Sequence, residues 1–102
     1  MKRHEIAFSP VARRQLIELR RYIAVRASLE IADGYVDRIV AQCRKLDTFP
    51  HRGTKRDNIR RGLRTIGFEH SATIAFRIVG PMVYIVAIAY RGRGLSNALT
   101  RS

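Results

Sequence analysis

Acidic residues are scarce in this chain, and cysteine is nearly absent. Asp and Glu together number 8 against 20 Lys and Arg, and Cys43 is the only cysteine. A single cysteine excludes an internal disulfide framework and is compatible with a reducing cytoplasm. Cys43 falls on the apolar stripe of a predicted helix, so we expect a small buried side chain rather than a reactive thiol.

Long apolar runs and cofactor motifs are also missing. No stretch approaches the length of a membrane-spanning helix, and the N-terminal segment MKRHEIAFSP lacks the apolar core of a signal peptide. The chain has neither a P-loop nor a G-x-G-x-x-G fingerprint, and His4, His51 and His70 are scattered. The sequence therefore predicts a cytoplasmic protein with no membrane contact, no cofactor and no metal site.

What the chain has in excess is arginine. The formal net charge is +12, and Lys2, Lys45 and Lys55 are the only lysines. Such a field attracts nucleic acid, acidic protein or anionic membrane, and arginine forks bind phosphate or carboxylate groups in pairs of hydrogen bonds. A genome with high arginine usage would give the same excess, so composition alone does not show that these arginines bind a partner.

The length of 102 residues allows one domain, residues 1–102. Residues 4–8 are a strand candidate, and Ser9-Pro10 supplies a helix cap followed by proline at the first helical position. Apolar residues at helical spacing then predict one helix from Pro10 and a second over residues 29–47. The two helices form a hairpin.

Three strands are expected after Pro50 and a loop at residues 51–54. They cover residues 63–68, 71–78 and 83–90, with Gly80-Pro81 as the turn between the last two. The predicted fold class is α+β, with an N-terminal strand and the helical hairpin packed on an antiparallel sheet of three to four strands. The other sheet face would carry Thr73, Arg77, and Tyr84 or Tyr90, open to a ligand.

The candidate binding residues are arginines before, within and after this sheet, together with Tyr90. Those considered for an anionic target or an acidic partner are Arg56, Arg60, Arg61, Arg64, Arg77, Tyr90, Arg91 and Arg93. A solvated basic surface is the competing interpretation, and Arg77 could instead pair with Glu69.

A ribonuclease would use these residues in a defined way. Cleavage by a 2′-hydroxyl needs a base, an acid for the leaving oxygen, and cations for the phosphorane charge. Arginine supplies cations but is a poor base because its pKa exceeds about 12. Tyr90 or His70 would have to take the proton.

Several segments, in order, resemble the ParE toxins of the RelE/ParE superfamily. They are IAFSPVARRQLIELRRYIA, LDTFPHRGTKRD, RRGLRTIGF and ATIAFRIVGPMVYIVAIAYRGRGL, which together span nearly the whole chain. The resemblance implies a RelE-like fold and the toxic half of a type II toxin–antitoxin pair. It also implies a cognate antitoxin, ParD-like and encoded beside the toxin, whose complex with the toxin sits on operator DNA through the antitoxin.

Within the superfamily, ParE members are associated with poisoning DNA gyrase and RelE members with cutting mRNA on the ribosome. Gly62-Leu63-Arg64 resembles the ParE pattern, which favours a protein inhibitor of gyrase over an enzyme. The chain departs from the family's terminal His-x-x-Arg-Asp, with Tyr90 for the histidine and Gly94 for the aspartate. The alternatives are a non-toxic relic that still binds the antitoxin and a ribosome-dependent mRNA interferase. For the interferase, the resemblance implies a catalytic set of Lys or Arg with a terminal Tyr or His, and the residues of this chain that could take those places are Arg64, Arg77, Tyr90, Arg91 and Arg93.

Overall fold

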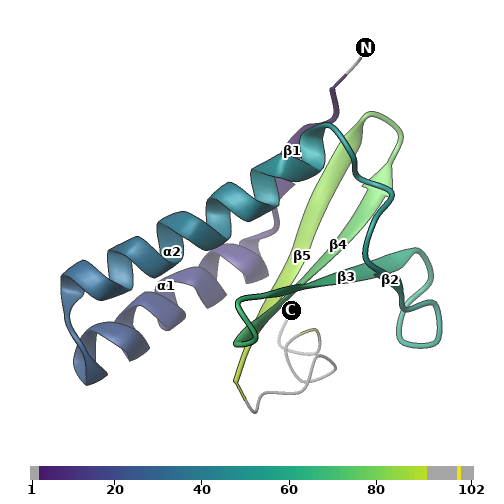
Figure 1. Ribbon diagram of the computed structural model, residues 1–102. Helices are drawn as coiled ribbons and strands as arrows, with labels where there is room; N and C mark the ends of the chain where they lie inside the picture. Colours follow the sequence, from purple (N-terminus) through teal and green to yellow (C-terminus); the bar gives the residue numbers. More distant parts are fainter. Residues whose placement is uncertain (1–2, 92–98, 100–102) are drawn as a thin grey trace.

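A helical hairpin lies on one face of a five-stranded sheet in the computed structural model, which describes residues 3–91 and Leu99 (Figure 1). The elements in chain order are β1 (Glu5–Phe8), α1 (Pro10–Arg26), α2 (Leu29–Arg44), the 3₁₀ turn η1 (Lys45–Asp47), β2 (Thr54–Lys55), β3 (Leu63–Phe68), β4 (Ala72–Val79) and β5 (Met82–Tyr90). The predicted α+β class is confirmed. The part of the chain described contains no helix with the length and apolarity that a membrane crossing requires.

Both helices begin at serine caps. The Ser9 hydroxyl accepts a hydrogen bond from the Ala12 amide at 3.0 Å and donates one to the Val86 carbonyl at 2.8 Å. The Ser28 hydroxyl accepts from the Ile31 amide at 3.1 Å. Each cap satisfies a helix N–H that would otherwise lack a partner, which contributes about 1 kcal/mol. Ser9 also joins the start of α1 to the sheet.

The sheet has one more strand than the maximum expected. Its order is β1-β5-β4-β3-β2, with β1 parallel to β5 and every other neighbouring pair antiparallel. The additional strand is β2, because Thr54 and Lys55, placed in or beside a loop by sequence, pair with Thr65 and Arg64. The N-terminal strand completes the other edge, so the sheet is mixed rather than purely antiparallel.

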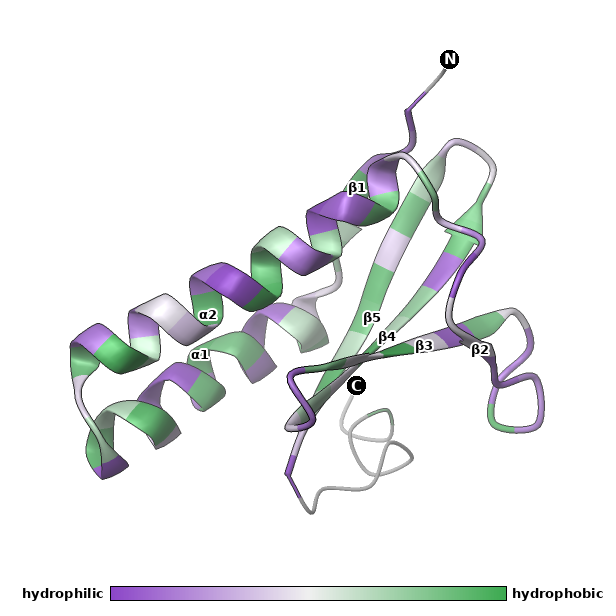
Figure 2. Ribbon diagram, in the orientation of Figure 1, coloured by the Kyte–Doolittle hydropathy of each residue, from purple (hydrophilic) through white to green (hydrophobic). Residues whose placement is uncertain are grey.

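The main core lies between the sheet and the hairpin. Its largest fully buried side chains include Ile39 from α2 and Phe76 and Ile85 from the central strands. Figure 2 shows apolar residues along β4 and β5, which Figure 1 draws to the right of the helices. Burying one such side chain contributes about 1.5–3 kcal/mol, so this layer supplies most of the stabilisation. Cys43 is completely buried here, as expected.

Candidate functional site

The face of the sheet that the helices do not cover, here called the open face, has small residues at its centre. Ala75, Ala87 and Ala89 form a second apolar cluster there with Leu63 and Leu99. Strand alternation places Thr73, Arg77 and Tyr84 on the same face. The centre of this face is buried, since Leu63, Ala75 and Ala87 are 0% exposed and Leu99 packs with them. The prediction that the face is open to a ligand is therefore wrong at its centre, and exposed side chains are found at the end that carries Arg77 and Tyr84.

Arg77 is exposed and lies across from Leu63 on β3 and Tyr84 on β5. A Cβ at Gly62 would lie 3.9 Å from the Arg77 Nε, so the backbone before β3 passes close to this guanidinium. The ion pair considered between Arg77 and Glu69 is not formed, because Glu69 pairs with Arg38 instead. The charge of Arg77 is thus presented on the open face.

A loop rich in arginine borders the open face, and we call residues 52–64 the basic loop. Its members with positive side chains are Arg52, Lys55, Arg56, Arg60, Arg61 and Arg64. Two hydrogen bonds connect the beginning of the loop to its end. The Arg56 amide donates to the Leu63 carbonyl at 2.8 Å, and the Gly62 amide donates to the Asp57 carboxylate at 2.9 Å. These bonds fix a compact loop whose exposed side chains point into solvent.

Two contacts anchor the basic loop to β3. The Arg56 Nε donates to the Thr65 hydroxyl at 3.1 Å, which brings Arg56 to the open face. Gly53 has φ of +81°, and a Cβ there would lie 2.3 Å from the Thr65 carbonyl oxygen. Only glycine allows this approach at a left-handed backbone conformation. Five of the predicted residues, Arg56, Arg60, Arg61, Arg64 and Arg77, therefore lie on the basic loop or near it.

Tyr90 lies at the other end of β5 and on the other face. Its ring makes edge contacts with Tyr22 and Tyr35 of the helices, with centroids 5.7 and 5.8 Å apart. Of the two tyrosines considered for the open face, Tyr84 is there and Tyr90 is not. A β-bulge between Ala75 and Phe76 shifts the register before Tyr90. No local sequence pattern predicts this bulge.

The catalytic set expected of a ribonuclease is not brought together in the part of the chain described. Tyr84, beside Arg77, and Tyr90 are separated by about 20 Å of extended strand. Tyr90 and Arg77 also point to opposite faces of the sheet. Arg91 follows Tyr90, with its guanidinium 5.5 Å from the centre of that ring. Arg93 lies outside the described residues.

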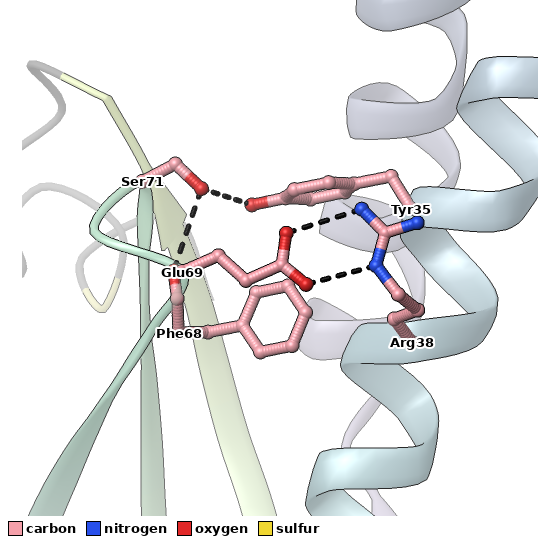
Figure 3. Close-up of polar contacts among 5 residues, drawn as sticks. All are labelled: Tyr35, Arg38, Phe68, Glu69 and Ser71. Carbon is pink, nitrogen blue, oxygen red and sulfur yellow. Dashed lines mark hydrogen bonds and ion pairs between the residues drawn. The ribbon is translucent and has the colours of Figure 1, made fainter.

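The turn between β3 and β4 is strained and tied to α2. Glu69 and His70 have φ of +47° and +56°, a conformation that costs non-glycine residues about 1–2 kcal/mol each. Figure 3 shows the two ties: Arg38 donates to both Glu69 carboxylate oxygens, at 2.8 and 3.1 Å, and the Tyr35 and Ser71 hydroxyls are 2.7 Å apart. Sequence reasoning missed this cluster because its members are far apart in the chain.

The pKa shifts of Glu69, Tyr35 and Cys43 agree with structural roles for these side chains. The hydrogen bond from Arg38 lowers the pKa of Glu69, and burial raises the pKa of Tyr35. Burial also raises the pKa of Cys43 to about 12, so this thiol stays protonated and unreactive at neutral pH. Over residues 3–91 and Leu99, no three His, Cys, Asp or Glu side chains gather in a way that could hold a metal ion.

The family model for the ParE toxin of the type II toxin–antitoxin system parDE matches residues 6–95. The chain belongs to the ParE toxin family. No curated protein sequence matches it significantly. Membership agrees with the order of elements.

Two solved structures show the same fold. One is a chromosomal ParDE toxin–antitoxin system from P. aeruginosa, with a TM-score of 0.76 and 24% identity, covering 85% of this chain and 95% of that one. The other is the toxin–antitoxin complex RelBE2 from Mycobacterium tuberculosis, with a TM-score of 0.63 and 20% identity, covering 89% and 94%. At these identities the likeness establishes the ParE/RelE fold alone.

Proposed function

We propose that this ParE-family toxin inhibits DNA gyrase without cutting nucleic acid, and that a cognate, ParD-like antitoxin neutralises it. The observation that carries the proposal is the separation of Arg77 from Tyr90. Arg77 lies on β4 beside Tyr84, near the start of β5, whereas Tyr90 ends β5 and points to the opposite face of the sheet. A phosphoryl-transfer site requires its base, acid and cations within hydrogen-bonding reach of one phosphate. The arrangement therefore favours a binding surface over a nuclease centre.

The charge distribution supports a target of negative potential. Arg56, Arg60, Arg61 and Arg77 lie on the basic loop or at the nearby end of the open face, and Asp57 is the only acid of that loop. A one-signed surface of this kind accelerates encounter with acidic protein or with the DNA that gyrase holds. We place the gyrase contact on this surface.

Neutralisation by an antitoxin is proposed on similar grounds. Both structural relatives are described as toxin–antitoxin systems or complexes. A toxin with a net charge of +12 would associate readily with an acidic antitoxin segment. In the cytoplasm the pair would sit on operator DNA through the antitoxin.

A gyrase assay with purified toxin tests the proposal. Supercoiling should fall and linear DNA should accumulate as toxin is added, and the product of the neighbouring gene should reverse both effects. Unchanged supercoiling at excess toxin, together with ribosome-dependent cleavage of mRNA, would replace the proposal with the mRNA interferase. Inertness in both assays, with the antitoxin still bound, would identify a non-toxic relic.

A further inference from the structure

Two positive side chains lie directly opposite each other at the edge of the sheet. Lys55 of β2 and Arg64 of β3 are partners in the antiparallel ladder. Side chains in such positions have Cβ atoms about 4.5–5.5 Å apart, and like charges there weaken the pairing of the strands. Because β2 contains only Thr54 and Lys55, the repulsion falls on one of its two cross-strand pairs.

Neither of these charges is neutralised by an acid. In the part of the chain that the structure describes, the ion pairs belong to the helices and to the turn after β3, not to Lys55 or Arg64. Asp57, the only acid of the basic loop, accepts a hydrogen bond from the Gly62 amide at 2.9 Å. Arg64 reaches the Arg52 carbonyl at a long 3.4 Å, and the Lys55 ammonium has no partner among the described residues. Two cations are therefore held together without an anion between them.

The same two side chains line a hollow of about 260 Å³. Leu63 and the half-buried Ile78 are the apolar residues of its lining. His51 adds an imidazole, and Asp57 adds the one carboxylate, to which the Gly62 amide already donates. The hollow thus combines two fixed cations and a further N–H group with an apolar wall.

The two cations lie on the other face of the sheet from Arg77. Arg64 lies across from Phe76 in the ladder, and Phe76 belongs to the core under the helices. Arg77 is the next residue of β4 and is exposed on the open face. A substitution at Lys55 therefore changes the hollow and leaves Arg77 in place.

A phosphate group suits this combination of residues. An arginine fork can donate two parallel hydrogen bonds to phosphate oxygens, and a lysine ammonium binds phosphate as a point charge. The apolar wall beside the cations accommodates the sugar that a nucleic-acid phosphate carries. Arg60 and Arg61 are exposed on the same loop, outside the hollow, where they would meet further phosphates of a chain. This series of cations favours a polymer of phosphates over a single small anion.

We propose that the hollow binds a backbone phosphate of double-stranded DNA, with Lys55 and Arg64 as its cationic ligands. The proposal rests on the gyrase contact proposed above, because gyrase would bring duplex DNA to the basic loop. It assigns to this loop a direct contact with DNA instead of with an acidic protein surface. A bound phosphate would remove the repulsion between Lys55 and Arg64, so DNA should stabilise the folded toxin.

Fluorescence anisotropy with a short labelled DNA duplex, in the absence of gyrase, tests the inference. Lys55→Gln should raise the Kd about tenfold and lower the slope of log Kd against log salt by about 1. The matched control is Lys45→Gln, which removes the same charge from an exposed position of η1 and should leave the slope unchanged. Equal changes in both variants, or no binding by the wild type at low salt, would overturn the proposal. Tighter binding to single-stranded RNA of the same length would overturn the assignment to DNA.

Thermal melting at low salt separates a binding role of Lys55 from a structural one. Without DNA, Lys55→Gln should melt about 2 °C higher than the wild type, because it removes the repulsion with Arg64. Added duplex should then raise the melting temperature of the wild type more than that of Lys55→Gln. A variant that melts lower than the wild type would overturn the proposal, since Lys55 would then support the fold.

Failure of this inference and failure of the gyrase proposal give different results. A wild-type toxin that binds the duplex through Lys55 but leaves supercoiling unchanged would contradict gyrase inhibition and keep the phosphate site. A Lys55→Gln toxin that inhibits gyrase as strongly as the wild type would overturn the role of this phosphate contact on gyrase and keep the inhibition.

Discussion

The two faces of the sheet differ in what they are built from. Toward the helices, β4 and β5 present Phe76, Ile85 and other large residues that are completely buried. On the open face the same strands present Ala75, Ala87 and Ala89, with Arg77 and Tyr84 toward one end. Large side chains stabilise the fold on one side. On the other side, the small residues are buried with Leu63 and Leu99, and exposed charge is found toward the end that carries Arg77.

The strongest test of this contrast is truncation on each face. Phe76→Ala should destabilise the protein by about 4 kcal/mol, because it opens a cavity in the helix-side core. Leu63→Ala should cost about 2 kcal/mol, since alanines surround it and less packing is lost. Urea unfolding followed by circular dichroism measures both. Equal losses would show that the open face carries as much of the stability as the covered one.

The basic loop requires glycine at position 53, whereas β3 does not require glycine at position 67. Gly53→Ala should destabilise the protein by about 3 kcal/mol, from the left-handed backbone and the overlap with the Thr65 carbonyl. Gly67→Ala should change the stability by no more than about 0.5 kcal/mol, because no atom lies within 4 Å of its added Cβ. Thermal melting of both variants checks this pair, and a Gly53→Ala protein as stable as the wild type would refute the loop geometry.

Arg77 should matter for binding and hardly at all for folding. Arg77→Gln removes an exposed charge, so the free energy of unfolding should change by no more than about 0.5 kcal/mol. Gyrase inhibition should weaken about tenfold, in line with the loss of a charge-assisted hydrogen bond. Urea unfolding and a supercoiling titration on the same preparation provide the comparison. A destabilised variant would show that Arg77 supports the fold.

The smallest effect is expected at the strained turn. The Arg38 hydrogen bond lowers the pKa of Glu69, so this pair stabilises the fold above the ordinary glutamate pKa of about 4.3. That contribution disappears as the pH falls through the lower, folded-state pKa. In Arg38→Gln the Glu69 pKa should return to its ordinary range, as measured by carboxyl ¹³C titration. An unchanged pKa would mean that the pair does not form in solution.

The elements could be predicted from the sequence because their signals are local. Ser9-Pro10 marks the start of α1, and Gly80-Pro81 marks the turn before β5, where the structure has them. Thr54–Lys55 could not be recognised as a strand, since two exposed residues carry no alternation and pair only because β3 lies beside them. The parallel pairing of β1 with β5 likewise depends on contacts distant in the chain.

The site could be predicted only in part, for a related reason. Alternation placed Arg77 on the open face together with Tyr84 or Tyr90. The bulge between Ala75 and Phe76 changes the register before Tyr90, so that Tyr84 lies on this face and Tyr90 does not. Gln15 carried a usable signal, a polar residue on the buried stripe of α1 beside Ala12 and Leu19. The role of that residue, which accepts a hydrogen bond from the Ile88 amide at 2.7 Å, required the position of Ile88, which no local pattern gives.

The central claim is that the arginines of the basic loop inhibit gyrase. The most direct test asks whether inhibition depends on where the positive charges lie or only on the net charge. Arg60 and Arg61 lie on the basic loop, whereas Arg13 and Arg21 are exposed on α1. Changing either pair to glutamine lowers the net charge by the same amount. In a gyrase supercoiling titration, the account predicts that the loop variant loses inhibition and the α1 variant keeps it. Equal loss in both variants would contradict the account, because the overall charge rather than the basic loop would then set inhibition.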